Sequence, residues 1–106
     1  MQRKLIVRVY LREGDRKLGD GKMLLDSLVR LLVQKLRVGG ITVFRGVMGC
    51  GHSGVVYESD LAHMSARLPL VVEFFGEETR LRTEVLPRLV EMIDAEHIVF
   101  WTVESP

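Results

Sequence analysis

Residues 70–75 read LVVEFF, an almost unbroken apolar run in an otherwise mixed sequence. Such a run is typical of a strand in the middle of a sheet with both faces covered. Gly76 follows the run and is expected to end the strand. The segments on either side determine which kind of sheet this strand belongs to.

A helix and a further strand are predicted after this run. Apolar residues recur at helical spacing over Glu77–Met92. Pro87 lies inside that pattern and is expected to kink or split the helix, because proline lacks an N–H group and clashes with the preceding turn. His97–Val103 is rich in β-branched and aromatic residues, which predicts a last strand.

Two strands and a helix are predicted before the run. The alternation of apolar and polar residues over Lys4–Arg12 predicts a strand with one buried face. Leucines at helical spacing predict an amphipathic helix over Lys22–Arg37, with Asp20 as its N-cap and Gly39-Gly40 as its end. The composition of Ile41–Met48 predicts a second strand.

These elements follow the βαββαβ order of the ferredoxin-like α+β fold. The two crossovers place the first and third strands in the middle of an antiparallel sheet, with both helices on one face. The other face is bare and partly apolar. Its candidate residues are Ile6, Tyr10, one of Phe74 and Phe75, and one of Phe100 and Trp101. Since such a face is usually covered by another subunit, we expect a homo-oligomer.

Length and composition restrict the class of protein. The 106 residues fit one domain spanning residues 1–106. With 15 basic and 14 acidic residues the net charge is only +1, which disfavours nucleic acid as a partner. Cys50 is the only cysteine, and the N-terminus lacks the long apolar stretch and cleavage site of a signal peptide. We therefore expect a cytoplasmic protein.

The topology brings three connections to the same end of the sheet. They are Glu13–Gly21, Arg45–Arg67 and Asp94–His97, and together they contain seven of the ten glycines. If the chain has a binding site, we expect it at this end.

The second connection contains a glycine-rich segment, RGVMGCGHSG, at residues 45–54. Glycines allow backbone N–H groups to approach a phosphate, and the side chains offer charge and hydrogen bonds. The candidate anion-binding residues are Arg45, Gly46, Gly49, Gly51, His52 and Ser53. The segment fits the G-x-G-x-x-G formula, but no parallel βαβ unit follows it, so we exclude a dinucleotide fold. A bulged hairpin loop is the structural alternative.

Lys22 is a further candidate, since it lies at the expected start of the first helix, where anions are favoured. A plain tight turn is the alternative there. Cys50, His52 and His63 suggest a metal site, but their spacing matches no strong zinc pattern. No Asp or Asn is placed to orient a histidine beside Cys50, so we assign no catalytic residue and expect no enzyme.

The segment ITVFRGVMGCG, residues 41–51, resembles the PII-like family known as domain of unknown function 190. Further segments fit the same resemblance in the same order along the chain. They are Val9–Leu11, Glu13–Asp15, Gly39–Val43, Leu68–Glu73 and Leu86–Met92. The family is similar to PII signalling proteins, which are ferredoxin-like and typically trimeric.

This resemblance implies a regulatory function. In PII proteins the connection between the second and third strands is the T-loop, and a Gly-x-Gly at its base contributes to an ATP or ADP site between subunits. Gly49 and Gly51 match that pair. The implied protein is a homotrimeric sensor of a nucleotide or small anion. An adenine nucleotide would be its ligand and not a resident cofactor. It would signal to a regulated partner such as a membrane transporter, and some relatives are encoded beside fluoride exporters.

The chain also departs from the family pattern. Cys50 stands where the family usually has an aromatic residue. The turn Asp94–His97 is acidic where PII proteins have a phosphate-gripping loop with glycine and lysine. Lys22 is the cation that we expect to compensate.

Two other functions occur on ferredoxin-like domains of this size. One is a metal-binding trimer of the divalent-ion-tolerance type, which would use the cysteine and histidines named above. The other is a small hydrolase such as an acylphosphatase, whose phosphate loop follows the first strand. Arg12, Gly14 and Arg16 are present there, but that family's signature is not.

Overall fold

The computed structural model describes residues 1–50, 56–58 and 67–106 and has the predicted α+β architecture. The strands are β1 (Gln2–Arg12), β2 (Ile41–Arg45), β3 (Met48–Cys50), β4 (Val56–Glu58), β5 (Pro69–Glu77) and β6 (Ile98–Ser105). The helices are α1 (Leu24–Arg30), α2 (Glu78–Arg80) and α3 (Leu86–Leu89). A π-helical turn extends α1 over Leu31–Lys35, and a second one joins α2 to α3 over Leu81–Val85. The βαββαβ order is therefore confirmed, with β3 and β4 inserted between β2 and β5.

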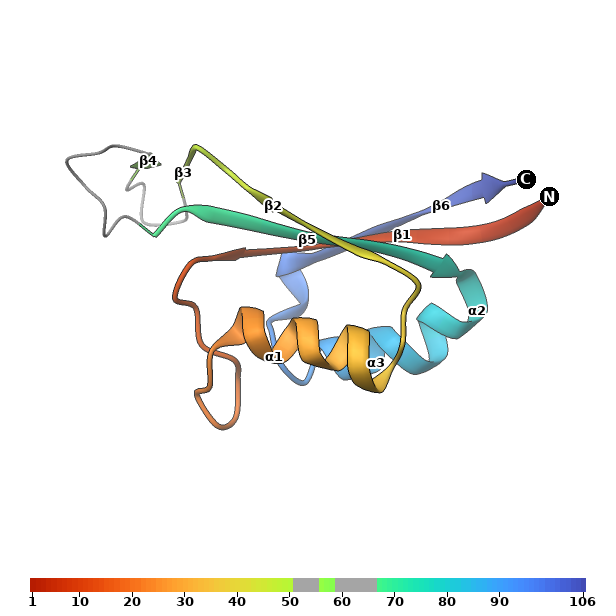
Figure 1. The fold of residues 1–106 in the computed structure, drawn as a ribbon, viewed down its shortest axis with the longest axis horizontal. Coiled ribbons are helices and arrows are strands. Elements are labelled where there is room, and N and C mark those ends of the chain that lie inside the picture. The colour runs from red at the N-terminus through yellow and green to blue at the C-terminus, as the bar shows by residue number, and fades with distance from the viewer. Residues whose placement is uncertain (51–55, 59–66) are drawn as a thin grey trace.

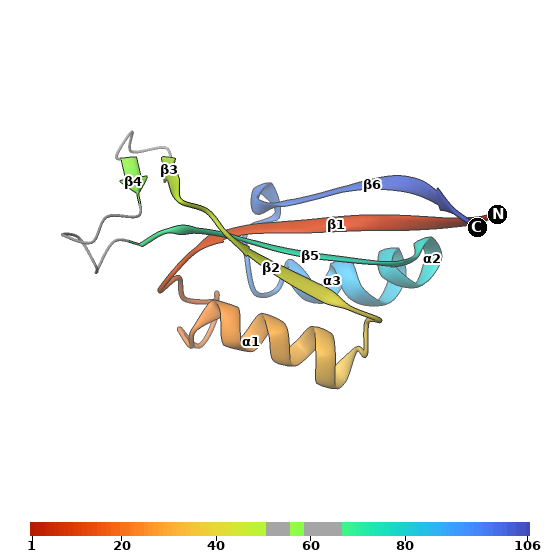
Figure 2. The ribbon, with the colours of Figure 1, turned by 45° about the horizontal axis from the view of Figure 1, so that its top comes forward.

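The four long strands form one antiparallel sheet in the order β2-β5-β1-β6. The first and third predicted strands, β1 and β5, thus lie in the middle as expected. Both helices cover the same face of this sheet, which gives the ferredoxin-like arrangement (Figures 1 and 2). The β3–β4 hairpin extends beyond one end of the sheet, and the two termini lie at the other end (Figure 1).

The face of the sheet toward the helices carries the hydrophobic core. Val7, Val9 and Phe74 on the central strands have no exposed surface. Leu28 and Leu89 on the two helices are also fully buried and belong to the same cluster. Within the described residues, no polar or charged residue is buried. Since each fully buried side chain of this size stabilises the fold by about 1.5–3 kcal/mol, this face holds the domain together.

The opposite face of the sheet, here called the open face, has none of the described helices over it. Directly opposed residues of paired strands lie on the same face, so Ile6 shares a row with Phe75 and Trp101. Phe75 is 53% exposed and Trp101 is 41% exposed. The open-face residues of the central strands are Lys4, Ile6, Arg8, Tyr10, Val71, Glu73, Phe75 and Glu77. Within this chain β5 is therefore covered on one face only, and the expectation of a strand covered on both faces is wrong.

Charged side chains lie among the open-face aromatics. Arg8 binds Glu73 with 2.7 Å between Nε and Oε1, and its guanidinium lies 5.6 Å from the centre of a Trp101 ring. The hydrogen bond to Glu73 is the main reason that the pKa of Arg8 is raised. Lys4 lies 5.7 Å from the ring centre of Phe75. The open face therefore combines apolar area with fixed charge.

The first helix differs from the prediction at both ends. Asp20 does not cap it, because the N-cap position is Met23 and the Asp20 carboxylate accepts a hydrogen bond from the Lys22 backbone N–H at 3.0 Å. The helical segment ends at Lys35, before the two glycines, and Arg37 follows its C-cap with a left-handed φ of 51°. The next N–H, that of Val38, turns back to the Leu32 carbonyl at 2.9 Å.

Gly76 does not end β5, which is a second correction. It pairs with Leu5, and the strand continues to Glu77. A Cβ atom at Gly76 would lie 3.4 Å from Cδ2 of Leu81. Leu81 of the second helix therefore packs next to this position of the strand.

A wide, π-helical turn precedes Pro87 in the second helix. The Leu86 N–H donates to the Leu81 carbonyl five residues earlier, and Pro87 occupies the first turn of α3. A proline is tolerated there because the N–H that it lacks would have no helical partner.

Among the described residues, no helix has the length and apolar character needed to cross a membrane.

Candidate functional site

Three connections meet at the end of the sheet that carries the β3–β4 hairpin. They are the loop after β1, the beginning of the hairpin, and the turn before β6 (Figure 1). One cavity is lined by residues from all three, with Asp15, Gly49 and His97 as their respective contributions. The expected meeting of these connections is confirmed.

This cavity, here called the sheet-end cavity, has a volume of about 390 Å³. Its lining residues are Tyr10, Leu11, Arg12, Asp15, Gly49, Cys50, Pro69, Leu70 and His97. A tyrosine, an arginine and a histidine therefore line one small space together with a glycine. A ring can stack on a planar ligand, and the cationic and imidazole groups can hold an anion.

Two candidate glycines pack against Pro69 at the edge of this cavity. A Cβ atom at Gly46 would lie 2.6 Å from Cγ of Pro69, and one at Gly49 would lie 3.0 Å from the same atom. The Gly46 N–H also donates to the Pro69 carbonyl at 2.8 Å. Both glycines are therefore needed for the close approach of the hairpin base to β5, and Gly49 in addition lines the cavity.

Arg45, another candidate, is held in an ion pair with Glu13. Arg67 donates to the Glu13 carbonyl at 2.7 Å and pairs with Asp15, whose carboxylate also accepts from the Arg12 N–H at 2.8 Å. These contacts tie the loop after β1 to both ends of the connection between β2 and β5. The charge of Arg45 is largely balanced by this network.

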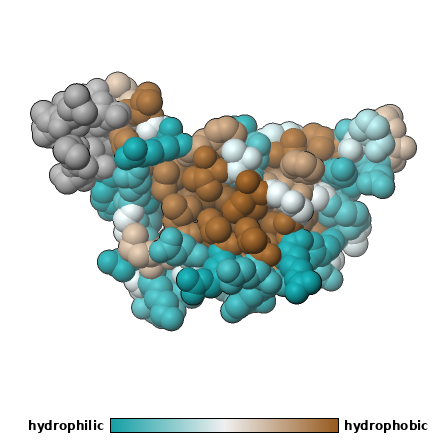
Figure 3. Space-filling view, viewed as in Figure 1, coloured by the Kyte–Doolittle hydropathy of each residue, from teal (hydrophilic) through white to brown (hydrophobic). Residues whose placement is uncertain are grey.

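Arg45 lines a different hollow, of about 430 Å³, between β2 and the start of α1. Leu25 and Val43 lie in its wall. Apolar side chains also dominate the surface between the sheet and α1 in this view (Figure 3). The structure thus places Arg45 beside an apolar surface and Gly49 in the sheet-end cavity.

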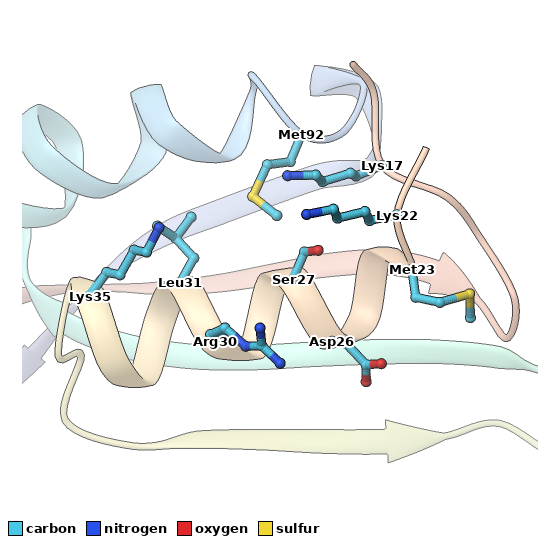
Figure 4. A pocket seen from close by; sticks show the side chains of 9 residues that line it. All are labelled: Lys17, Lys22, Met23, Asp26, Ser27, Arg30, Leu31, Lys35 and Met92. Atoms are coloured by element: carbon cyan, nitrogen blue, oxygen red, sulfur yellow. The ribbon is translucent and has the colours of Figure 1, made fainter. Parts of the chain in front are cut away.

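Lys22 lies away from both glycines. It lines a groove of about 360 Å³ between α1 and the loop before it, here called the basic groove (Figure 4). The lining residues are Lys17, Lys22, Met23, Asp26, Ser27, Arg30, Leu31, Lys35 and Met92. The backbone N–H of Lys22 is the main cause of the lowered pKa of Asp20, with Lys17 adding to it. Lys22 therefore lines a groove other than the sheet-end cavity, and its role beside the acidic turn stays a prediction.

Three candidate residues, Gly51, His52 and Ser53, lie outside the described residues, and so does His63. Cys50 is an exposed free thiol at the edge of the sheet-end cavity. Within residues 1–50, 56–58 and 67–106, no three His, Cys, Asp or Glu side chains are grouped as metal ligands. The proposed metal site at Cys50, His52 and His63 stays a prediction.

Sequence reasoning missed Tyr10, Arg12 and His97 as residues of the cavity. Tyr10 and Arg12 were assigned to a strand, and His97 alone near a turn is most often structural. The signal that could have found them was the topology, because the ends of β1 and the turn before β6 were already expected beside the glycine-rich connection.

Comparison with known proteins identifies a family for this chain. Residues 4–105 match the DUF190 family, which is described as "Uncharacterized ACR". The chain is also 32% identical over 97 residues to a UPF0166 protein of Methanocaldococcus jannaschii. This match covers 92% of this chain and 85% of the relative. Since the family match spans nearly the whole βαββαβ unit and the connections that form the cavity, this chain belongs to the DUF190 family.

Proposed function

We propose that this protein is a PII-like regulatory module that binds a small anionic ligand, with an adenine nucleotide as the first candidate. The observation that carries the proposal is the composition of the sheet-end cavity. Tyr10 offers a ring for a base, Arg12 and His97 offer partners for phosphate oxygens, and Gly49 permits close approach of backbone. Its volume lies within the range of small-molecule sites.

The regulatory step follows from where the cavity lies. Gly49 and Cys50 belong to the connection between β2 and β5, so a ligand in contact with them acts on the base of that connection. A change of conformation there would alter the surface offered to a partner protein, such as a membrane transporter. The cavity would thereby couple ligand concentration to a protein contact.

A homotrimer is part of this proposal. The open face exposes the large side chains of Phe75 and Trp101, and Tyr10 links this face to the cavity. A second and third copy covering these faces would remove apolar surface from water and close the cavity from the side. Light scattering on the purified protein should give three times the chain mass. A monomer at all accessible concentrations would contradict this part of the proposal.

Thermal unfolding with a ligand panel tests the binding step. The panel is ATP, ADP, AMP, cyclic AMP and cyclic di-AMP, each with and without magnesium. A ligand at a hundred times its Kd should add about 2.7 kcal/mol to the stability. A flat panel would count heavily against nucleotide binding.

Two variants locate the site. Tyr10→Ala should abolish the shift, because it removes the ring from the cavity. Val99→Ala is the matched control, since Tyr10 and Val99 are both 41% exposed on the open face but only Tyr10 lines the cavity. Equal loss of the shift in both variants would place the effect in the assembly and not in the cavity.

A further inference from the structure

We propose that the basic groove is a second binding site, for a small molecule that carries a phosphate group. Four of its lining residues are cationic and one is acidic: Lys17, Lys22, Arg30 and Lys35 against Asp26. The whole chain has a net charge of only +1. The groove therefore concentrates positive charge that the rest of the molecule balances.

The backbone holds two of these lysines side by side. The Lys17 N–H donates to the Lys22 carbonyl at 2.8 Å, and Arg16 and Met23 form the adjoining bridge. The Leu18 N–H donates to the Met92 carbonyl at 2.8 Å, which fixes this loop against the end of the second helix. Two like charges on directly opposed residues repel each other. An anion bound between the Lys17 and Lys22 ammonium groups would remove this repulsion.

Figure 4 shows how the side chains lie. Lys17 and Lys22 run parallel and point the same way, over Ser27 and toward Met92, while Lys35 approaches from the far end of the helix. The space between them belongs to one groove of about 360 Å³. A phosphate there would meet ammonium groups from both ends and the Ser27 hydroxyl from below.

The cationic side chains of the basic groove form fewer ion pairs with carboxylates than the arginines of the second helix do. Lys17 binds Asp20 at 3.2 Å. Lys22, Arg30 and Lys35 form no ion pair with the residues that the structure describes. By contrast, the arginines on the exposed side of the second helix are paired, for example Arg82 with Glu78 at 3.0 Å and Arg88 with Glu91 at 3.8 Å. Positive charge in the groove is thus available to a ligand.

The walls of the groove define the ligand class. Leu31, Met23 and Met92 give it apolar sides, whereas the lysines supply point charges that suit phosphate oxygens. The volume suits a small phosphate ester with a compact organic part. No lining residue is shared with the sheet-end cavity, so the two sites are separate.

Amide chemical shifts in NMR test the proposal. The probes are inorganic pyrophosphate and glycerol 3-phosphate, titrated at constant ionic strength with chloride as the reference anion. We expect saturable shifts at Lys17, Lys22 and Ser27 and smaller ones at Gly49. Shifts that follow ionic strength alone would overturn the proposal.

Charge-removing variants make the test specific. Lys22→Gln and Lys35→Gln should each weaken pyrophosphate binding about tenfold, the size expected for one lost charge-assisted hydrogen bond. Both residues are exposed, so the fold should be retained. Arg88→Gln is the matched control, because it removes the same charge from a paired surface arginine. Equal weakening by all three variants would contradict a site in the groove.

The phosphate group could come from a free metabolite or from a lipid headgroup, and vesicles distinguish these sources. Binding to phosphatidic acid vesicles but not to phosphatidylcholine vesicles, lost in Lys22→Gln, would assign a lipid. Binding of glycerol 3-phosphate without vesicle binding would assign a free ester. Failure of every probe would overturn the second site and leave the nucleotide proposal, which concerns other residues, untouched.

Discussion

The two faces of the sheet differ, although the same strands build both. On the helix side, Val7 and Phe74 are fully buried, and no buried residue among those described is polar. On the open face, Phe75 and Trp101 are exposed and lie beside Lys4 and Arg8. Successive side chains of a strand thus lie on opposite faces of the sheet, in different surroundings. One face stabilises the chain, and the other is available for recognition.

Phe74 and Phe75 test this difference most directly. Phe74→Ala should lower the free energy of unfolding by about 3–5 kcal/mol, because it leaves a cavity in the core. Phe75→Ala should cost far less, since the side chain is already half in water, and should weaken self-association instead. Chemical denaturation and light scattering measure the two effects. Similar losses of stability in both variants would contradict the division between the faces.

Gly46→Ala tests the contact between the base of the hairpin and Pro69, the first residue of β5. The new Cβ would lie 2.6 Å from Pro69, so we expect a loss of about 1–3 kcal/mol in unfolding free energy. Gly39→Ala is the matched control, because nothing lies within 4 Å of its added Cβ. The double variant Gly46→Ala/Pro69→Ala should recover much of the loss. No recovery would show that the proline is not the obstacle.

Arg37→Gly should stabilise the helix layer that covers the buried face. Arg37 has a φ of 51°, a conformation that costs a residue with a Cβ about 1 kcal/mol and glycine almost nothing. We expect a gain of up to about 1 kcal/mol by chemical denaturation, reduced by the greater freedom of glycine in the unfolded chain. Arg37→Ala removes the same charge but keeps the Cβ, so it should give no gain. A gain from alanine equal to that from glycine would show that the side chain, not the backbone, was unfavourable.

Glu77→Gln should have the smallest effect on stability, and this effect should depend on pH. The Glu77 carboxylate accepts from the Arg80 and Thr79 N–H groups, which lowers its pKa below the ordinary 4.5. Its stabilisation is therefore complete at neutral pH and is lost as the pH falls through the folded-state pKa. Thermal unfolding should show a lower Tm for Glu77→Gln at neutral pH and convergence with the parent in acid. The control is Glu84→Gln, which removes the same charge from a carboxylate that accepts from the Arg80 side chain.

The order of elements could be predicted from sequence because period-two and helical patterns are strong here. The alternation over Lys4–Arg12 also gave the buried face of β1 correctly. The errors concern places where tertiary contacts override local preference. Gly76 stays in its strand, where it pairs with Leu5, and a non-glycine residue, Arg37, takes the left-handed conformation after the first helix.

The candidate site was predicted less well. Topology brought the three connections to one end of the sheet, and Gly49 lines the cavity there, but the binding site itself stays a prediction. Lys22 lies in the last part of the loop after β1, which folds toward Met92, and it lines the basic groove and not the sheet-end cavity. The cavity residues Tyr10 and His97 come from distant parts of the chain, and no local pattern links them.

Trp101 has a practical consequence. It is the only tryptophan in the sequence, and it lies on the open face. Its intrinsic fluorescence should therefore report the hydration of that face without any label. As the protein is concentrated, covering of the indole by a second copy would move the emission to shorter wavelengths. A dilution series followed in a fluorimeter would then yield the association constant of the native chain.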